Sequence, residues 1–299
     1  MARILAVGIT TIDVINELDG YPAEDEEVRA VAHRRARGGN AANLLAVLAQ
    51  LGHECYLAGT LPWREVPGAA EMLDELHRQQ IDIRHCRRVS GDVVPTSYIC
   101  LNRQNGSRTI VHYRDVFPEF DCADFERIDL EGFDWVHFEG RNVDETASMM
   151  DWVASIRPSL PRSLEVEKAR AGIDCLFEHA NAIFFSASSA RAQGYSSALD
   201  FLRALAPAPT GRTLVCSWGE EGASAIGPDG QELSCPAEAM EEVVDTIGAG
   251  DVFIAGVIDG LVTGAPLHKA LAQGCGLAGA KCAQRGLDGL VLAVRGQRR

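Results

Sequence analysis

The sequence lacks the patterns that mark several classes of protein. It has no CxxC pair, no HExxH motif and no GxxxxGK[ST] motif. No stretch approaches the ~18 uninterrupted apolar residues of a membrane-spanning helix. Positive charge is also scarce, because 28 Lys and Arg stand against 42 Asp and Glu, for a net charge of −14. This balance argues against nucleic acid and anionic membranes as partners, and a polyanionic substrate would need a locally positive pocket.

The cysteines and the N-terminal residues indicate the cellular location of the protein. The nine cysteines are odd in number and irregularly spaced, which favours buried or reduced thiols over a disulfide framework or a zinc site. The first residues, MARILAVGIT, hold too short an apolar run for a signal peptide, so we expect a soluble, cytoplasmic protein. With 46% hydrophobic residues, the chain can build one large core, and we expect a single domain over 1–299.

Short apolar runs alternate with longer helical patterns, as in a parallel sheet covered by helices. The clearest helix is 40–51, where Leu44, Val47 and Leu48 fall on one face. The turn 227–230 (GPDG) predicts a late antiparallel hairpin. The expected strands are 4–8, 55–59, 135–138, 164–166, 182–186 and 213–217. The other expected helices are 69–80, 144–156, 172–179, 190–205, 249–262 and 266–285.

Two segments break this alternation. Residues about 10–37 and 92–115 have the pattern of strands joined by turns, and we expect them to form one small sheet although they are distant in sequence. A sheet of this size is unstable alone, so it should pack over the main domain, over a second chain, or over both. The alternative is that these strands are an ordinary addition at the edge of the main sheet, without a role at a site. We favour a lid, because residues with useful chemistry lie in or beside both segments.

A Gly-rich turn before a helix, 243–253 (VVDTIGAGDVF), is the most informative stretch of the chain. Gly248 and Gly250 allow backbone N–H groups to converge, and the positive end of the following helix also attracts an anion. Asp251 is well placed to take a proton from a hydroxyl that attacks the bound phosphate. The plain alternative is a common turn with an acid in the first turn of a helix. The candidate catalytic residues are Asp251, Gly248, Ala249 and Gly250.

The segment 37–43 (RGGNAAN) directly precedes the best amphipathic helix. Its glycines let a ligand approach the main chain, and the side-chain amides of Asn40 and Asn43 share one helical side, where they can bind hydroxyls. Asp13 follows the first strand, at the edge where α/β folds bind ligands. These features suit the binding of a polyol ligand. The alternatives are a helix-capping role for Asn40 and a solvated turn position for Asp13.

Phosphate and metal contacts have weaker candidates. Arg108 lies at a hairpin tip from which a guanidinium could reach a phosphate, although a solvated hairpin arginine is commoner. Glu139, Glu165 and Glu167 end two strands and could hold Mg²⁺ through water, or simply be surface charge. The GxGxxG match at 274–279 follows a helical pattern instead of a strand, so close helix packing explains it better.

Two of these motifs together resemble a known family. The segments 38–43 (GGNAAN) and 245–251 (DTIGAGD) are similar to the two signatures of the ribokinase, or phosphofructokinase-B (PfkB), family of sugar kinases. Other family-like segments follow in the expected order, and the resemblance covers almost the whole chain. It implies a ribokinase-like three-layer α/β/α sandwich with a mostly parallel central sheet. It also implies a small β-sheet lid that clasps the lid of a second subunit in a homodimer.

The resemblance also implies roles for individual residues. Asp251 matches the base, with Gly248, Ala249 and Gly250 as its anion hole. The positions that match sugar-hydroxyl binders are Asp13, Gly39, Asn40, Asn43 and, reaching across the dimer, Asp25. The positions that match ATP contacts are Arg108, Trp218, Gly219, Glu220, Glu221, Gly222 and Cys282.

The activity implied is transfer of the ATP γ-phosphate to a sugar hydroxyl, with Mg²⁺ and, as in many members, a monovalent cation such as K⁺. Within the family the chain is most similar to kinases of ketohexoses, which make the 1-phosphate of D-fructose. The alternatives are another sugar, a sugar acid or a nucleoside as acceptor, or a catalytically silent sugar sensor. An Asn-x-x-Glu element of many members is missing, since 185–190 here is FSASSA, so the metal ligands stay unassigned.

Overall fold

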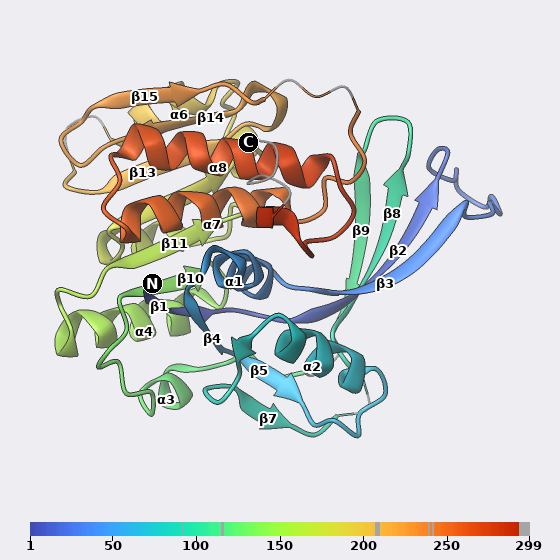
Figure 1. The fold of residues 1–299 in the computed structure, drawn as a ribbon, viewed down its shortest axis with the longest axis horizontal. Helices are drawn as coiled ribbons and strands as arrows, with labels where there is room; N and C mark the ends of the chain where they lie inside the picture. Colours follow the sequence, from blue (N-terminus) through green and yellow to red (C-terminus); the bar gives the residue numbers. More distant parts are fainter. Residues whose placement is uncertain (92, 115–116, 207–209, 239, 241, 293–299) are drawn as a thin grey trace.

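A nine-stranded sheet forms the centre of the computed structural model, which describes residues 1–91, 93–114, 117–206, 210–238, 240 and 242–292 (Figure 1). Its strand order is β15-β14-β13-β12-β11-β10-β1-β4-β6. Neighbours from β13 to β6 are parallel, while β14 and β15 form the antiparallel hairpin expected at 227–230. The strands are β1 (Arg3–Val7), β4 (Glu54–Ala58), β6 (Ile81–Asp82), β10 (Trp135–Glu139), β11 (Arg162–Val166), β12 (Ala182–Ser186), β13 (Thr213–Ser217), β14 (Ala223–Ile226) and β15 (Glu232–Cys235).

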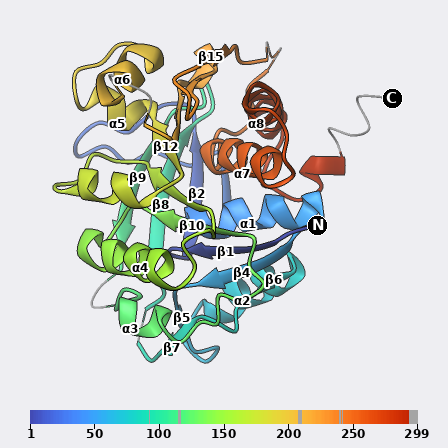
Figure 2. The same cartoon turned by 90° about the vertical axis from the view of Figure 1, so that its left-hand side faces the viewer.

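Helices cover both faces of this sheet, which confirms the three-layer sandwich (Figure 2). One face carries α1 (Asn40–Leu51), α2 (Ala69–Arg78), α7 (Ala249–Val262) and α8 (Leu267–Cys282). The other face carries α3 (Cys122–Phe125), α4 (Val143–Ile156), the 3₁₀ segment η1 (Ile173–His179), α5 (Ala187–Arg191) and α6 (Ala198–Leu205). The apolar faces of these helices bury two hydrophobic cores, one on each side of the sheet.

Two helix predictions were wrong in detail. The helix expected at 190–205 is two short helices, because Gly194 has a positive φ of 88° and Ser197 caps a new start by accepting the amide of Asp200. The helix expected at 172–179 is a 3₁₀ segment. The 274–279 glycines lie inside α8, as expected for helix packing: a Cβ on Gly274 would lie 2.8 Å from the carbonyl oxygen of Phe253 in α7.

The two segments that break the α/β alternation supply one small sheet, which we call the small sheet and which projects from the main body (Figure 1). Its strand order is β3-β2-β8-β9. Residues 92 and 115, the expected ends of the second segment, lie outside the described residues. The strands are β2 (Thr11–Leu18), β3 (Ala32–Gly38), β8 (Thr96–Asn102) and β9 (Arg108–Tyr113). A separate pair, β5 (Thr60–Pro62) and β7 (Arg87–Val89), lies beside α2 (Figure 1).

One face of the small sheet is turned toward the α7 turn. Ile15, Ile99 and Leu101 form a buried cluster against which Ile247 packs. All nine cysteines are free thiols, and no helix of the described residues is long and apolar enough to cross a membrane.

Candidate active site

Two glycines bring the small sheet against the start of α1. Strand β3 enters α1 through Gly38 and Gly39, and a Cβ on Gly38 would lie 2.3 Å from the Asp13 carboxylate of β2. Gly39 has a φ of 106°, and a Cβ there would lie 2.1 Å from the carbonyl oxygen of Ile9. Only glycine tolerates both the conformation and this close approach. The buried Asp13 carboxylate is therefore held next to the first turn of α1.

A line of hydrogen bonds leads from Arg37 through Asn43 to Asp251. Arg37, only 4% exposed, donates from Nη1 to Oδ1 of Asn43 at 2.9 Å. Nδ2 of Asn43 donates to Oδ2 of Asp251 at 2.7 Å. Because both ends of the Asn43 amide are engaged, its orientation and that of the Asp251 carboxylate are fixed relative to each other. A residue of α1 thereby positions the acid of α7.

The Gly-rich turn lies directly beside this pair. Gly248 precedes α7 in the left-handed conformation, with a φ of 81°, and its Cβ position is 3.8 Å from Oδ2 of Asp251. Among the described residues, nothing lies within 4 Å of the Cβ position of Gly250. Space is therefore open in front of the helix start. One detail differs from expectation: the amide of Ala249 already donates to the carbonyl of Thr246, at 3.2 Å, so the amides on either side of it are better placed to meet an anion.

Two more carboxylates approach the site from the central sheet. Glu139 and Glu165 are opposite each other in β10 and β11, and both are buried. Glu139 accepts the amide of Ala41 at 2.7 Å, and Glu165 accepts from Nδ2 of Asn40 at 2.8 Å. The side chain of Asn40 is thus directed at a carboxylate and does not cap its own helix, whose cap position is Gly39. The third candidate, Glu167, is exposed.

Burial raises the pKa values of these acids. For Asp251 and Glu165, desolvation is the main cause, and repulsion between their carboxylates and from Glu139 and Glu167 adds to it. Desolvation likewise raises the pKa of Glu139, against the attraction of Arg141. The pKa of Asp13 is raised for the same reason, although Thr11, Ser97 and Arg37 oppose the shift. The site therefore concentrates negative charge that a bound cation would stabilise.

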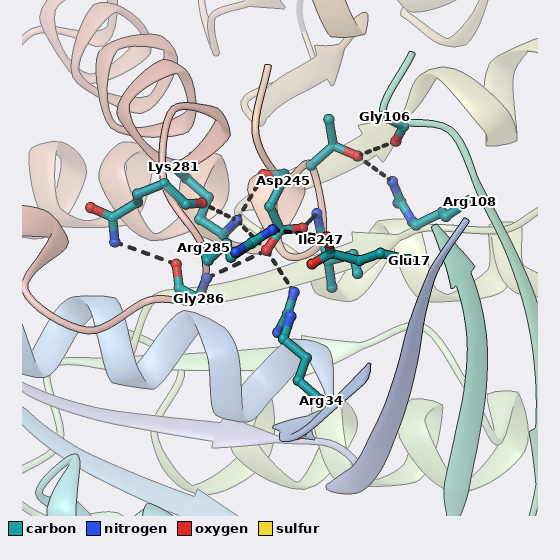
Figure 3. A network of polar contacts seen from close by, with 11 residues as sticks. Glu17, Arg34, Gly106, Arg108, Asp245, Ile247, Lys281, Arg285 and Gly286 are labelled. Carbon is teal, nitrogen blue, oxygen red and sulfur yellow. Dashed lines mark hydrogen bonds and ion pairs between the residues drawn. The ribbon is translucent and has the colours of Figure 1, made fainter. Parts of the chain in front are cut away.

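The Arg108 hairpin and the end of α8 both contact this turn. Arg108 donates to Oγ1 of Thr246 at 3.4 Å, and Thr246 donates to the carbonyl of Gly106 at 2.9 Å (Figure 3). The carbonyl of Cys282 accepts the amides of Val244 and Asp245, at 2.8 and 3.2 Å. Arg108 and Cys282, distant in sequence from each other, therefore flank the turn that precedes Asp251.

Comparison with known proteins assigns the family. The pattern of the pfkB family carbohydrate kinases matches residues 1–291. Ketohexokinase of Mus musculus is 40% identical over 298 residues, which cover 97% of this chain and 99% of that protein. The chain belongs to the pfkB family of carbohydrate kinases. It is therefore a phosphotransferase that acts on a sugar hydroxyl.

Solved structures of low sequence identity share the fold of this pfkB-family kinase. Ribokinase from Cryptococcus neoformans in complex with ADP superposes with a TM-score of 0.79 at 17% identity, covering 99% of this chain and 100% of that one. Adenosine kinase from Sinorhizobium meliloti superposes with a TM-score of 0.78 at 19% identity, covering 99% of each chain. The ribokinase-like fold is thus confirmed, and the fold alone does not select between a sugar and a nucleoside.

Other candidate residues of this pfkB-family kinase lie apart from the Asp251 turn. The Trp218 ring is buried in the core, with the Arg191 guanidinium 4.9 Å from its centroid, so it offers no free face for a base. Gly219, Glu220 and Glu221 form an exposed 3₁₀ turn after β13. Gly222 follows with a φ of 97°, and a Cβ there would lie 2.1 Å from the carbonyl oxygen of Cys235. No hydrogen bond within the described residues joins 219–222 to the Asp251 turn.

Asp25 is also separate from the other sugar-side candidates. It lies in the exposed loop between β2 and β3, with a positive φ of 62°. In the described part of the chain, no hydrogen bond links it to Asp13, Asn40 or Asn43. A contact of Asp25 with a sugar in its own subunit therefore has no support from this geometry.

A cavity borders Glu139 at the end of β10. Thr10, Thr60, Glu139 and Arg141 are among the residues that line it. The Arg141 guanidinium is 3.6 Å from the Glu139 carboxylate, and its Nε has no hydrogen-bond partner in the described structure. Asp251 is not among the described residues that line this cavity.

Sequence reasoning missed the basic residues that hold the site together. In the sequence Arg37 is only the first residue of the glycine motif 37–43, although it fixes the Asn43 amide in the structure. Lys281 and Arg34 lie outside the predicted motifs, yet both bind the buried Asp245 carboxylate, at 3.2 and 2.9 Å. The only signal for Lys281 is a lone lysine among small residues of a helix, in LAGAKC. Its importance follows from contacts that no local pattern encodes.

Proposed function

We propose that this chain is an ATP-dependent ketohexose kinase that transfers the γ-phosphate of ATP to the 1-hydroxyl of D-fructose. The supporting observation in the structure is the fixed pair of Asn43 and Asp251 at the start of α7, next to open space at Gly250. The ketose acceptor is supported by the 40% identity to a ketohexokinase over nearly the whole chain.

The proposed chemistry uses Asp251 as the general base. The hydroxyl oxygen attacks the γ-phosphorus while its proton passes to the Asp251 carboxylate, and the bond from the γ-phosphorus to the bridging oxygen breaks, so that ADP leaves. Amides at Gly248 and Gly250, the helix dipole and Arg108 stabilise the charge on the transferring group. Asp13, Gly39, Asn40 and Asn43 bind the other sugar hydroxyls. On the nucleotide side, we propose that the turn 219–222 and Cys282 border the base.

Mg²⁺ fits the acidic edge of the site as a cation carried by the nucleotide. Desolvation raises the pKa values of Glu139 and Glu165, and repulsion from Glu139 adds to the shift of Glu165. A divalent cation nearby would favour the ionised form of both carboxylates. No group of three or more possible ligands within the described residues could hold a metal ion directly. We therefore propose that Glu139, Glu165 and the exposed Glu167 reach Mg²⁺ through water, while the phosphates bind it directly. A requirement for a monovalent cation such as K⁺ stays a prediction.

We further propose that the small sheet is a lid and the interface of a homodimer. Tyr98 and Val111 are paired across β8 and β9, as are Thr96 and Tyr113, so these side chains share the face opposite Ile247. Tyr98 is 49%, Val111 64% and Tyr113 50% exposed. A second copy would cover this apolar face and bring the partner subunit's Asp25 to the sugar. With nine free thiols, the cytoplasm is the proposed location.

The decisive experiment is an acceptor panel with ATP, Mg²⁺ and coupled detection of ADP. D-fructose should give the highest kcat/KM, ahead of aldoses, sugar acids and nucleosides. A higher kcat/KM for ribose or adenosine would replace the ketohexose assignment with another acceptor. Calorimetric binding of fructose without any ADP release would instead identify a silent sugar sensor.

A further inference from the structure

Lys281 is a fully buried ammonium group surrounded by oxygen atoms. Its Nζ donates to the carbonyl oxygen of Asp245 at 2.8 Å and to that of Gln284 at 3.2 Å, and it lies 3.2 Å from Oδ2 of Asp245. The side chain is 0% exposed. Burial lowers the pKa of Lys281, and the Asp245 carboxylate opposes that shift. A buried charge of this kind is costly unless its partners are fixed, so it constrains the main chain that it binds.

The main chain that Lys281 binds is the start of the phosphate-side turn. Asp245 is 1% exposed, and its Oδ1 accepts the amide of Ile247 at 2.9 Å. The turn reaches Gly248 one residue after Ile247. Lys281 therefore fixes both the carbonyl and the carboxylate of the residue that begins the DTIGAGD segment (Figure 3).

The same carboxylate also joins the turn to the small sheet. Arg34 of β3 donates to Oδ2 of Asp245 at 2.9 Å. Next to it, Arg285, just after α8, donates to Glu17 of β2 at 2.8 Å (Figure 3). The two positive charges of Lys281 and Arg34 exceed the one negative charge of Asp245. The chain as a whole is strongly acidic, so this cluster supplies local positive charge where a polyanion is expected.

We propose that Lys281 is a positioning residue, a built-in cation that holds the Asp245–Gly250 turn in the conformation that receives the phosphate, with Arg34 tying the lid to the same carboxylate. This inference rests on the proposed site of phosphoryl transfer at Asp251. Lys281 touches neither sugar nor nucleotide in this scheme. It acts through Asp245, and its loss should displace the amides of the turn.

The test compares Lys281→Ala with Lys269→Ala, since Lys269 is an exposed lysine on the same helix. We expect Lys281→Ala to lose about 10²-fold in kcat/KM for ATP, the scale of a misplaced reacting group. Ammonium chloride should recover part of the loss, because ammonium can enter the vacated space, whereas tetramethylammonium chloride of the same ionic strength should not. Lys269→Ala should keep the wild-type rate and show no ammonium response beyond that of the wild type.

Hydrogen exchange of the 243–253 segment gives a readout that does not depend on turnover. Lys281→Ala should exchange faster there than Lys269→Ala and match it in β10 and β11. Wild-type kinetics or unchanged exchange in Lys281→Ala would overturn the proposal, as would a loss that ammonium does not reduce. If Lys281→Ala does not fold, the deciding variant is Arg34→Met, whose side chain is partly exposed. Faster hydrogen exchange of 243–253 in Arg34→Met supports the proposal, and unchanged exchange contradicts it. A wild-type protein that releases no ADP would refute the proposed function alone.

Discussion

The central sheet and the small sheet differ in how their positions are fixed. Every residue of β10 and β11 is buried, whereas every residue of β9 is exposed. Strands of the first kind are held by packing on both faces, as parallel strands between helices are. The small sheet has a packed face toward Ile247 and an open face opposite. Its position against the main body depends on that one packed face and on a few polar contacts, and in the proposed dimer also on the second copy.

This contrast divides the site by role. Asp251, Asn43 and Glu165, which meet the reacting groups in our proposal, belong to α7, α1 and β11 of the packed region. Asp13, Arg34 and Arg108 belong to the small sheet. In our proposal the base therefore has a fixed position, while part of the recognition of sugar and phosphate comes from the less packed small sheet. Such a division suits an enzyme that must exclude water before transferring a phosphoryl group.

The largest expected effect comes from the packed region. Asp251→Asn should lower kcat with fructose and ATP by about 10²–10⁴-fold, because general-base help is lost while the Asn43 contact can persist. ADP release measures the rate, and thermal unfolding checks that the fold is intact. The control is Asp200→Asn, an exposed acid in the first turn of α6, which should keep the wild-type rate. Near-normal turnover of Asp251→Asn would show that the base lies elsewhere.

The junction between the two regions should be sensitive to one methyl group. Gly39→Ala should lower the free energy of unfolding by more than about 1–2 kcal/mol, the cost of a left-handed alanine. The new Cβ meets the Ile9 carbonyl oxygen, and the backbone at φ 106° and ψ 126° lies outside the left-handed helical region. Gly52→Ala is the comparison for a left-handed position without a close contact, because Gly52 has a φ of 100° and a ψ of 22° with nothing described within 4 Å of its Cβ position. Urea unfolding of both variants gives the difference. Equal losses would mean that the contact at Gly39 relaxes freely.

The open face of the small sheet should respond through assembly. Val111→Asp places a charge at the centre of the proposed dimer interface and should raise the dimer Kd by about tenfold or more. Light scattering across a concentration series measures this shift. Ile156→Asp, at an exposed apolar position at the end of α4, should leave the Kd unchanged. A wild-type protein that stays monomeric throughout the series would remove the interface.

The smallest expected effect is on how the free energy of unfolding depends on pH, through the buried Glu165 of the packed region. The pKa of Glu165 is raised in the folded state, so its stabilising contribution is present below the unfolded pKa and is lost as pH rises through the folded pKa. Gln cannot ionise, and we expect Glu165→Gln to gain stability over the wild type as pH rises, by about 1.4 kcal/mol per unit of pKa elevation. Urea unfolding at about pH 5 and about pH 8 tests this. The exposed Glu167→Gln is the control, and a gain that shrinks with pH would contradict the assignment.

Local sequence signals predicted the parts of the site that lie on one element. The helix 40–51, the Gly-rich turn before α7 and the strand ends at Glu139 and Glu165 are where the patterns placed them. What a pattern could not show was contact between elements. Arg37 orients Asn43, and Lys281 anchors Asp245, through tertiary hydrogen bonds with no periodic signature. The expected helix at 190–205 ran across Gly194 and Ser197, although a glycine followed by a capping serine is itself a break signal.

The most direct test of the account is a crystal structure with D-fructose, Mg²⁺ and an ATP analogue that cannot transfer its terminal group. The account predicts the sugar 1-hydroxyl at about 2.6–3.2 Å from the Asp251 carboxylate. The γ-phosphate should face the amides of Gly248 and Gly250, with Arg108 beside it. A sugar bound away from Asp251, with that carboxylate still contacting only Asn43, would contradict the central claim.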